Sequence, residues 1–132
     1  MSKSRKPVVA AIVSALMPVV LFAHHGTAGT YDVSKVRKVS GTVKQFFWRN
    51  PHCALVLTGR DESGAAVTYS FEIGGPGGLV REGWSKTTFK PGDMVSLEMH
   101  PAYGNPNVGQ PLRSTIVLNG KPLPGGGAGD NE

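Results

Sequence analysis

A strict alternation of apolar and polar side chains over residues 66–73 constrains the fold of this chain most. Bulky apolar residues occupy every second position: Val67, Tyr69, Phe71 and Ile73 alternate with Thr68, Ser70 and Glu72. Successive side chains of a strand point to opposite faces of a sheet, so a period of two predicts one buried and one solvated face. We therefore expect a half-buried antiparallel strand here.

Four further segments show the same kind of pattern. Together with residues 66–73, strands are expected at 39–48, 52–60, 94–100 and 112–118. Asn50-Pro51 ends the first run, because proline cannot donate a hydrogen bond to a strand ladder. Lys90-Pro91-Gly92-Asp93 fits a type II turn, with proline and glycine at its central positions. Residues 101–111 are rich in Gly, Pro and Asn and predict a loop.

The segment between the third and fourth strands differs. Residues 74–78 form a glycine-rich corner, and residues 78–83 predict one or two helical turns that end at Gly83. We therefore predict an all-β protein, a small five-stranded antiparallel OB-like barrel with a short helical corner between strands 3 and 4. A seven-stranded immunoglobulin-type sandwich is the alternative, but the strands are too few. The residues expected inside the barrel are Val43, Val67, Tyr69, Phe71, Val95 and Leu97.

Residues 1–23 have the three parts of an export signal: a basic start at residues 2–6, an apolar run from Pro7 to Phe22, and the small residue Ala23. The apolar run is shorter than the roughly 20 residues that a transmembrane helix needs. We expect cleavage after Ala23 and a periplasmic or secreted protein without a stable membrane anchor. An uncleaved anchor is the alternative.

The remaining chain divides into an N-terminal arm at 24–38, the OB-like barrel domain at 39–119 and a disordered Gly/Pro-rich tail at 120–132. The chain has 14 Lys and Arg against 9 Asp and Glu, but three of the basic residues belong to the signal. Its positive charge is therefore weak evidence for a nucleic-acid partner, and none is expected. Cys53 is the single cysteine, which excludes an intrachain disulfide, and a core position is expected for it.

Four histidines are the candidate metal ligands. After cleavage His24 would be the first residue, and its amine and imidazole would form a chelate for copper or zinc. His52 directly follows the Asn50-Pro51 break at a barrel end, and His100 ends the fourth strand. We predict that His24, His25 and His52 bind Cu(II) or Zn(II), with His100 as a candidate fourth ligand. The alternative is a free terminus and two ordinary surface histidines.

Several short motifs resemble those of a known family. They are Ala23-His24-His25, Gly41-Thr42-Val43, Trp48-Arg49-Asn50-Pro51-His52, Gly75-Pro76, Gly83-Trp84 and Lys90-Pro91-Gly92-Asp93. From His24 to about Leu123 the chain resembles exported bacterial proteins that are described only as a domain of unknown function. It departs from them at Gly26, where relatives have serine, and at Arg49, where a residue such as threonine is common. The resemblance implies export and supports the fold, and it brings no established activity.

Two functions fit these features. The first is an exported periplasmic binding or accessory module that holds a metal ion or small ligand, or docks onto a periplasmic protein partner. The alternative is a metalloenzyme or redox accessory protein with an N-terminal histidine copper site. The only candidate acids or bases near the histidines are Glu72 and Glu98, and no nucleophile motif is present. This scarcity favours binding over catalysis, and no catalytic residue is assigned.

Overall fold

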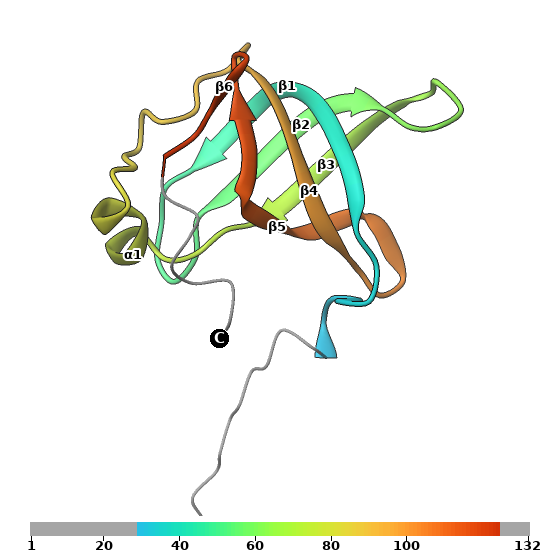
Figure 1. The fold of residues 1–132 in the computed structure, drawn as a ribbon, viewed down its shortest axis with the longest axis horizontal. Helices are drawn as coiled ribbons and strands as arrows, with labels where there is room; N and C mark the ends of the chain where they lie inside the picture. The colour runs from blue at the N-terminus through green and yellow to red at the C-terminus, as the bar shows by residue number, and fades with distance from the viewer. Residues whose placement is uncertain (1–28, 125–132) are drawn as a thin grey trace, which may run out of the picture.

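The computed structural model describes residues 29–124. Within this range the elements are β1 (Arg37–Phe47), β2 (Ala54–Arg60), β3 (Ala66–Glu72), α1 (Pro76–Arg81), β4 (Met94–Ala102), β5 (Asn105–Leu118) and β6 (Lys121–Pro122) (Figure 1). No helix among these residues is long and apolar enough to cross a membrane. The predicted signal peptide, His24 and His25 lie outside the described residues.

The strands β1 to β5 close into a barrel. β1 pairs with β2 and β4, β2 pairs with β3, and β4 pairs with β5, all antiparallel. Parallel pairing of β3 with β5, through Ser70–Val108 and Phe71–Gly109, completes the ring. This confirms the predicted five-stranded barrel in the described residues, and the circuit matches the OB-type topology.

The prediction was wrong in one respect, because the barrel is mixed and not purely antiparallel. A closed ring of five strands has an odd number of members, so strand direction cannot alternate at every contact. One parallel contact is unavoidable, and it falls between β3 and β5. Closure leaves fewer unpaired strand edges than an open sheet would.

The barrel interior is apolar, as predicted. The buried residues include Val43, Tyr69, Phe71, Val95 and Leu97, while Val67 is partly buried and packs against them. Cys53, expected in the core, is fully buried, and this burial raises the pKa of its thiol.

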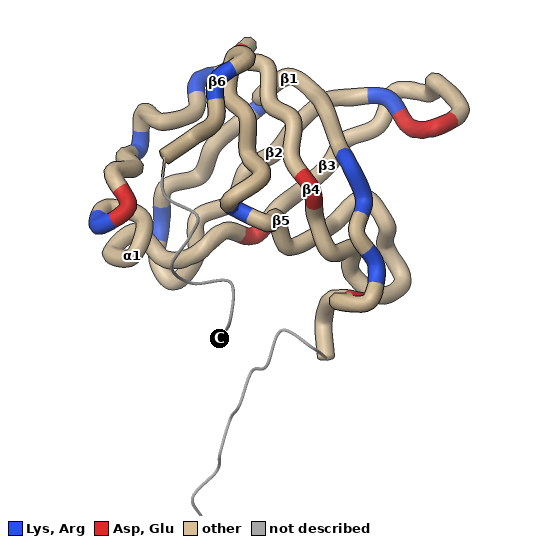
Figure 2. Tube along the Cα trace, in the orientation of Figure 1, with Lys and Arg blue, Asp and Glu red and all other residues tan. Residues whose placement is uncertain are grey.

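Charged side chains stay out of this core. Among residues 29–124 no polar or charged residue is buried. Lysines and arginines occupy the start of β1, and Lys38 there pairs with Glu98 on the neighbouring β4 (Figure 2). In this part of the chain, polar and charged side chains therefore lie on the barrel surface and at its ends.

The helix α1 lies beside the turn between β1 and β2, and it ends where the sequence predicts. Gly83 has φ +87°, the Trp84 N–H donates to the Leu79 carbonyl at 2.9 Å, and the Gly83 N–H donates to the Val80 carbonyl at 3.0 Å. This is the Schellman arrangement of helix ends, which needs a left-handed residue at the glycine position. Leu79 is fully buried and anchors the helix to the barrel.

The loop predicted at residues 101–111 is instead a hairpin. β4 continues to Ala102, Tyr103 and Gly104 form a two-residue turn, and β5 begins at Asn105. Gly104 has φ +78°, a conformation that glycine adopts at little cost. The Gly, Pro and Asn content predicts a loop, although much of it lies within the first half of β5.

The predicted disordered tail also begins with structure. Asn119 and Gly120 have φ +49° and +80°, and the following residues Lys121 and Pro122 pair with β5 as β6. Positive φ at both central residues is the requirement of a type I′ hairpin turn, for which Asn-Gly is the preferred sequence. The Asn119-Gly120 dipeptide is therefore the sequence feature that predicts this last hairpin.

Replacing Gly109 by alanine should lower the free energy of unfolding by about 1–3 kcal/mol, because the barrel closes too tightly there for a side chain. A Cβ at this position would overlap the Met99 sulfur and lie 2.8 Å from the His100 carbonyl oxygen. Gly77→Ala in α1 is the matched control, since a Cβ there meets nothing within 4 Å. Urea unfolding should show the control unchanged or stabilised by up to about 1 kcal/mol. Equal stability of the two variants would contradict this account of the closure.

Candidate functional site: a pocket beside the turn between β1 and β2

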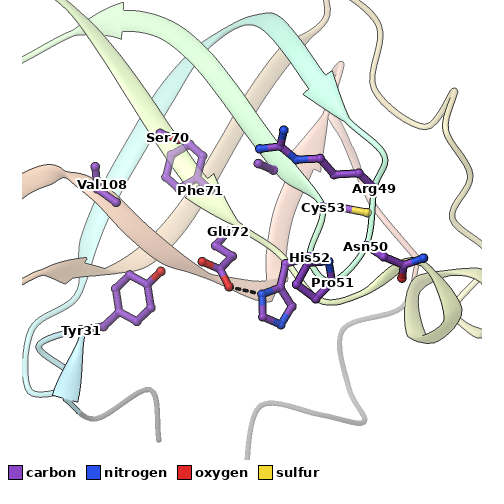
Figure 3. A pocket seen from close by; sticks show the side chains of 11 residues that line it. Tyr31, Arg49, Asn50, Pro51, His52, Cys53, Ser70, Phe71, Glu72 and Val108 are labelled. Atoms are coloured by element: carbon purple, nitrogen blue, oxygen red, sulfur yellow. Dashed lines mark ion pairs between the residues drawn. The ribbon is translucent and has the colours of Figure 1, made fainter. Parts of the chain in front are cut away.

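A pocket of about 480 Å³ lies where the turn between β1 and β2 meets the end of β3 and the start of β5. Its polar side chains include Tyr31, Arg49, His52 and Glu72, and the partly exposed Val108 contributes apolar surface (Figure 3). OB-type barrels bind ligands on the β2–β3 face, next to the loop that joins strands 1 and 2. The pocket therefore occupies the ligand-binding position of this architecture.

The turn that carries His52 is held by backbone contacts. The Asn50–Pro51 peptide bond is cis. The Cys53 N–H donates to the Gly74 carbonyl at 3.2 Å, and the Ile73 N–H donates to the Cys53 carbonyl at 2.9 Å. These bonds extend the pairing of β2 with β3 beyond the strand ends, so the backbone next to His52 is fixed at the pocket.

His52 faces Glu72 inside the pocket. Its Nδ1 forms an ion-pair contact with the Glu72 Oε1, and both side chains are about half exposed (Figure 3). A carboxylate can only accept a hydrogen bond, so Nδ1 is the donor in this contact, and in the neutral form of the ring the lone pair then lies on Nε2. A histidine that binds a metal almost always has this arrangement, with its second ring nitrogen donating to a carboxylate or carbonyl.

Tyr31 brings the N-terminal arm to the same pocket. It forms an isolated antiparallel bridge with Ala102 at the end of β4, and the Asp32 N–H donates to the Pro101 carbonyl at 2.8 Å. Burial, and to a lesser extent the negative charge of Glu72, raise the pKa of the Tyr31 hydroxyl. The phenol therefore stays neutral at physiological pH.

Arg49 supplies a positive charge at the pocket wall. Its guanidinium lies over the Phe47 ring, 4.9 Å from the ring centroid, which is a cation–π contact. The residue is exposed, and it belongs to the same turn as His52. The pocket thus combines one fixed anion, Glu72, with a cation and an imidazole.

The structure places His100 differently from His52. On β4 its neighbours Met99 and Pro101 are buried, so its side chain lies on the outer face, and its Nδ1 donates to the Lys35 carbonyl at 2.7 Å. Across residues 29–124 no three His, Cys, Asp or Glu residues gather in a group that could hold a metal ion. In the described part of the chain, His52 and His100 therefore do not form a metal-binding group with a third residue of these types. The positions of His24 and His25 fall outside it.

Sequence reasoning identified His52 but missed its surroundings. The sequence predicts Glu72 only as a candidate acid or base, and the approach of Glu72 to His52 follows from the strand register, which sets Glu72 opposite Ala54. That register could be deduced only if the length of the turn between β2 and β3 were known. Tyr31 lies in a segment without periodicity, so no sequence signal marked it.

Comparison with known proteins gives one family. Residues 11–110 match DUF6152, described as a family of unknown function. The chain belongs to this family. The match covers about three quarters of the 132 residues, including β1 to β4, the start of β5 and all four histidine positions of the chain. A search of curated proteins gives no match. Membership in DUF6152 confirms the predicted resemblance to a family of unknown function, and it carries no activity with it.

Proposed function

We propose that this DUF6152 protein is an exported, non-catalytic binding or accessory module that holds Cu(II) or Zn(II) at the pocket beside His52. The contact between the Nδ1 of His52 and Glu72 carries this proposal. It leaves Nε2 free to bind a metal, and the carboxylate both orients the ring and makes it a stronger electron donor. The half-exposed side chain is accessible to an ion from solvent.

The N-terminal histidines would supply the other donors. Tyr31 lies in the pocket only seven positions after His24. Seven extended residues span up to about 23–25 Å, so His24 and His25 are within reach of His52. The amine and imidazole of His24 would add two nitrogen donors, and a nitrogen-rich site favours copper among the divalent metals.

The same pocket supports binding better than catalysis. Glu72 already holds the His52 ring, and the raised pKa of Tyr31 keeps its hydroxyl protonated and therefore unavailable as a base. His100 is left out of the proposed site, since its outward position and its bond to the Lys35 carbonyl give no support for a fourth ligand. Export remains part of the proposal and rests on the signal-like residues 1–23.

The chelate by His24 requires a free amine on that residue. Intact mass of the exported protein should first show a chain that starts at His24. A matched chain with Gly-Ser-Gly-Ser added before His24 keeps every imidazole and moves the amine away. Competition titration with Cu(II) and Zn(II) should show affinity at least about tenfold lower for the extended chain, equivalent to about 1.4 kcal/mol. Equal affinities would exclude the amine from the site.

A further inference from the structure

Exposed apolar side chains gather where the N-terminal arm meets the turn between β4 and β5. Val33, Val36 and Tyr103 are 53%, 54% and 61% exposed. The two segments are tied together, because the Tyr103 N–H donates to the Thr30 carbonyl at 3.1 Å and Tyr31 bridges to β4. Scattered exposed apolar residues need no explanation, but a group of them at one corner of a small domain is typical of an interaction surface.

Two lysines add positive charge to this corner. Lys35 pairs with Asp32 at 2.9 Å, and Lys38 pairs with Glu98 at 3.6 Å. In each pair the lysine is far more exposed than the acid, 70% against 14% for the first and 86% against 32% for the second. The carboxylates are therefore recessed and the ammonium groups are outermost. Figure 2 shows Lys and Arg positions just before β1 and at its start.

We name this surface the basic–apolar face, defined by Val33, Lys35, Val36, Lys38 and Tyr103. Surface ion pairs contribute at most about 1 kcal/mol, so the two lysines can exchange their carboxylates for other anions at little cost. Tyrosine combines an apolar ring with a polar tip, which suits the boundary between water and hydrocarbon. The face thus offers shallow apolar groups surrounded by cations.

We propose that the basic–apolar face binds reversibly to the surface of a bilayer that contains anionic phospholipid. Each lysine near such a surface changes binding by about fivefold, and the exposed apolar side chains add insertion at the headgroup level. The apolar residues stand at turns and strand ends, and none of them lines the pocket beside His52. Exposed apolar side chains of this kind can insert between lipid headgroups. A stable protein partner, in contrast, needs about 800 Å² of complementary surface on each side.

This inference does not depend on metal binding, yet it bears on the pocket. Tyr31 lines the pocket and also joins the arm to β4 next to Tyr103. A protein docked through the basic–apolar face would therefore hold the pocket close to the membrane surface.

Vesicle sedimentation tests the proposal with the chain that starts at His24. Vesicles of phosphatidylcholine with phosphatidylglycerol should bind the protein, and vesicles of phosphatidylcholine alone should not. Binding should fall as salt is added, because ions screen the attraction. Lys35→Glu with Lys38→Glu should lower the partition coefficient at least about tenfold. Tyr103→Ser should lower it less.

The matched control is Lys86→Glu with Lys121→Glu, which makes the same change in net charge at exposed positions away from this face. Thermal unfolding checks that both double variants fold. If both lose binding equally, attraction by net charge alone explains the result and the proposal fails. Binding to soluble polyglutamate but not to anionic vesicles would also overturn it, in favour of an acidic protein partner.

Discussion

Replacing Phe71 by alanine should lower the free energy of unfolding by about 3–5 kcal/mol. The ring is fully buried in β3, between the pairing with Leu55 on β2 and the parallel contact with Gly109 on β5. It also stacks with Tyr69, with ring centroids 6.4 Å apart. Removing the ring leaves a cavity where the barrel closes, and the paired strands on both sides limit how far the wall can collapse into it.

Urea unfolding measures this loss, and Thr68→Ala is its control. Thr68 belongs to the same strand but lies exposed on the opposite face, so its replacement should change stability by no more than about 0.5 kcal/mol. A loss of unfolding free energy below about 1 kcal/mol for Phe71→Ala, or equal losses for the two variants, would contradict the claim that the Phe71 ring stabilises the closure of the barrel.

The barrel was predictable because its strands have one buried and one solvated face. The alternation over residues 66–73 fixed which side chains of β3 point inward, and the structure buries Tyr69, Phe71 and Ile73. A closed ring of five strands also requires one parallel contact, although this count alone does not place it between β3 and β5. Residues 105–111 were harder to assign, because Pro and Gly occur within β5 itself and mimic a loop.

The candidate site was only partly predictable, because its contacts join distant parts of the chain. The Asn50-Pro51 break correctly indicated that His52 lies at a barrel end. The approach of Glu72 depends on strand register, and that of Tyr31 depends on a single bridge between the arm and β4. His100 looked equivalent to His52 by its place at a strand end, yet its ring nitrogen bonds to the Lys35 carbonyl on the outer face. A linear pattern cannot distinguish these two environments.

Replacing His52 by alanine should weaken the binding of Cu(II) and Zn(II) at least about tenfold, and up to about 100-fold. Changes in the outer partners of metal-binding histidines already cost about 10–100-fold, so loss of the ligand itself should cost no less. The His52 side chain is about half exposed and packs little against the core, so the variant should keep its fold. Its unfolding transition should therefore stay close to that of the unchanged protein.

Metal titration of three chains that start at His24 tests the proposed site most directly: the unchanged protein, His52→Ala and His100→Ala, each measured against a competing chelator. The account predicts that His52→Ala falls toward the affinity of a free peptide with the same N-terminal residues, while His100→Ala stays unchanged. Equal affinities for the unchanged protein, His52→Ala and the free peptide would contradict it, because the barrel would then contribute no ligand.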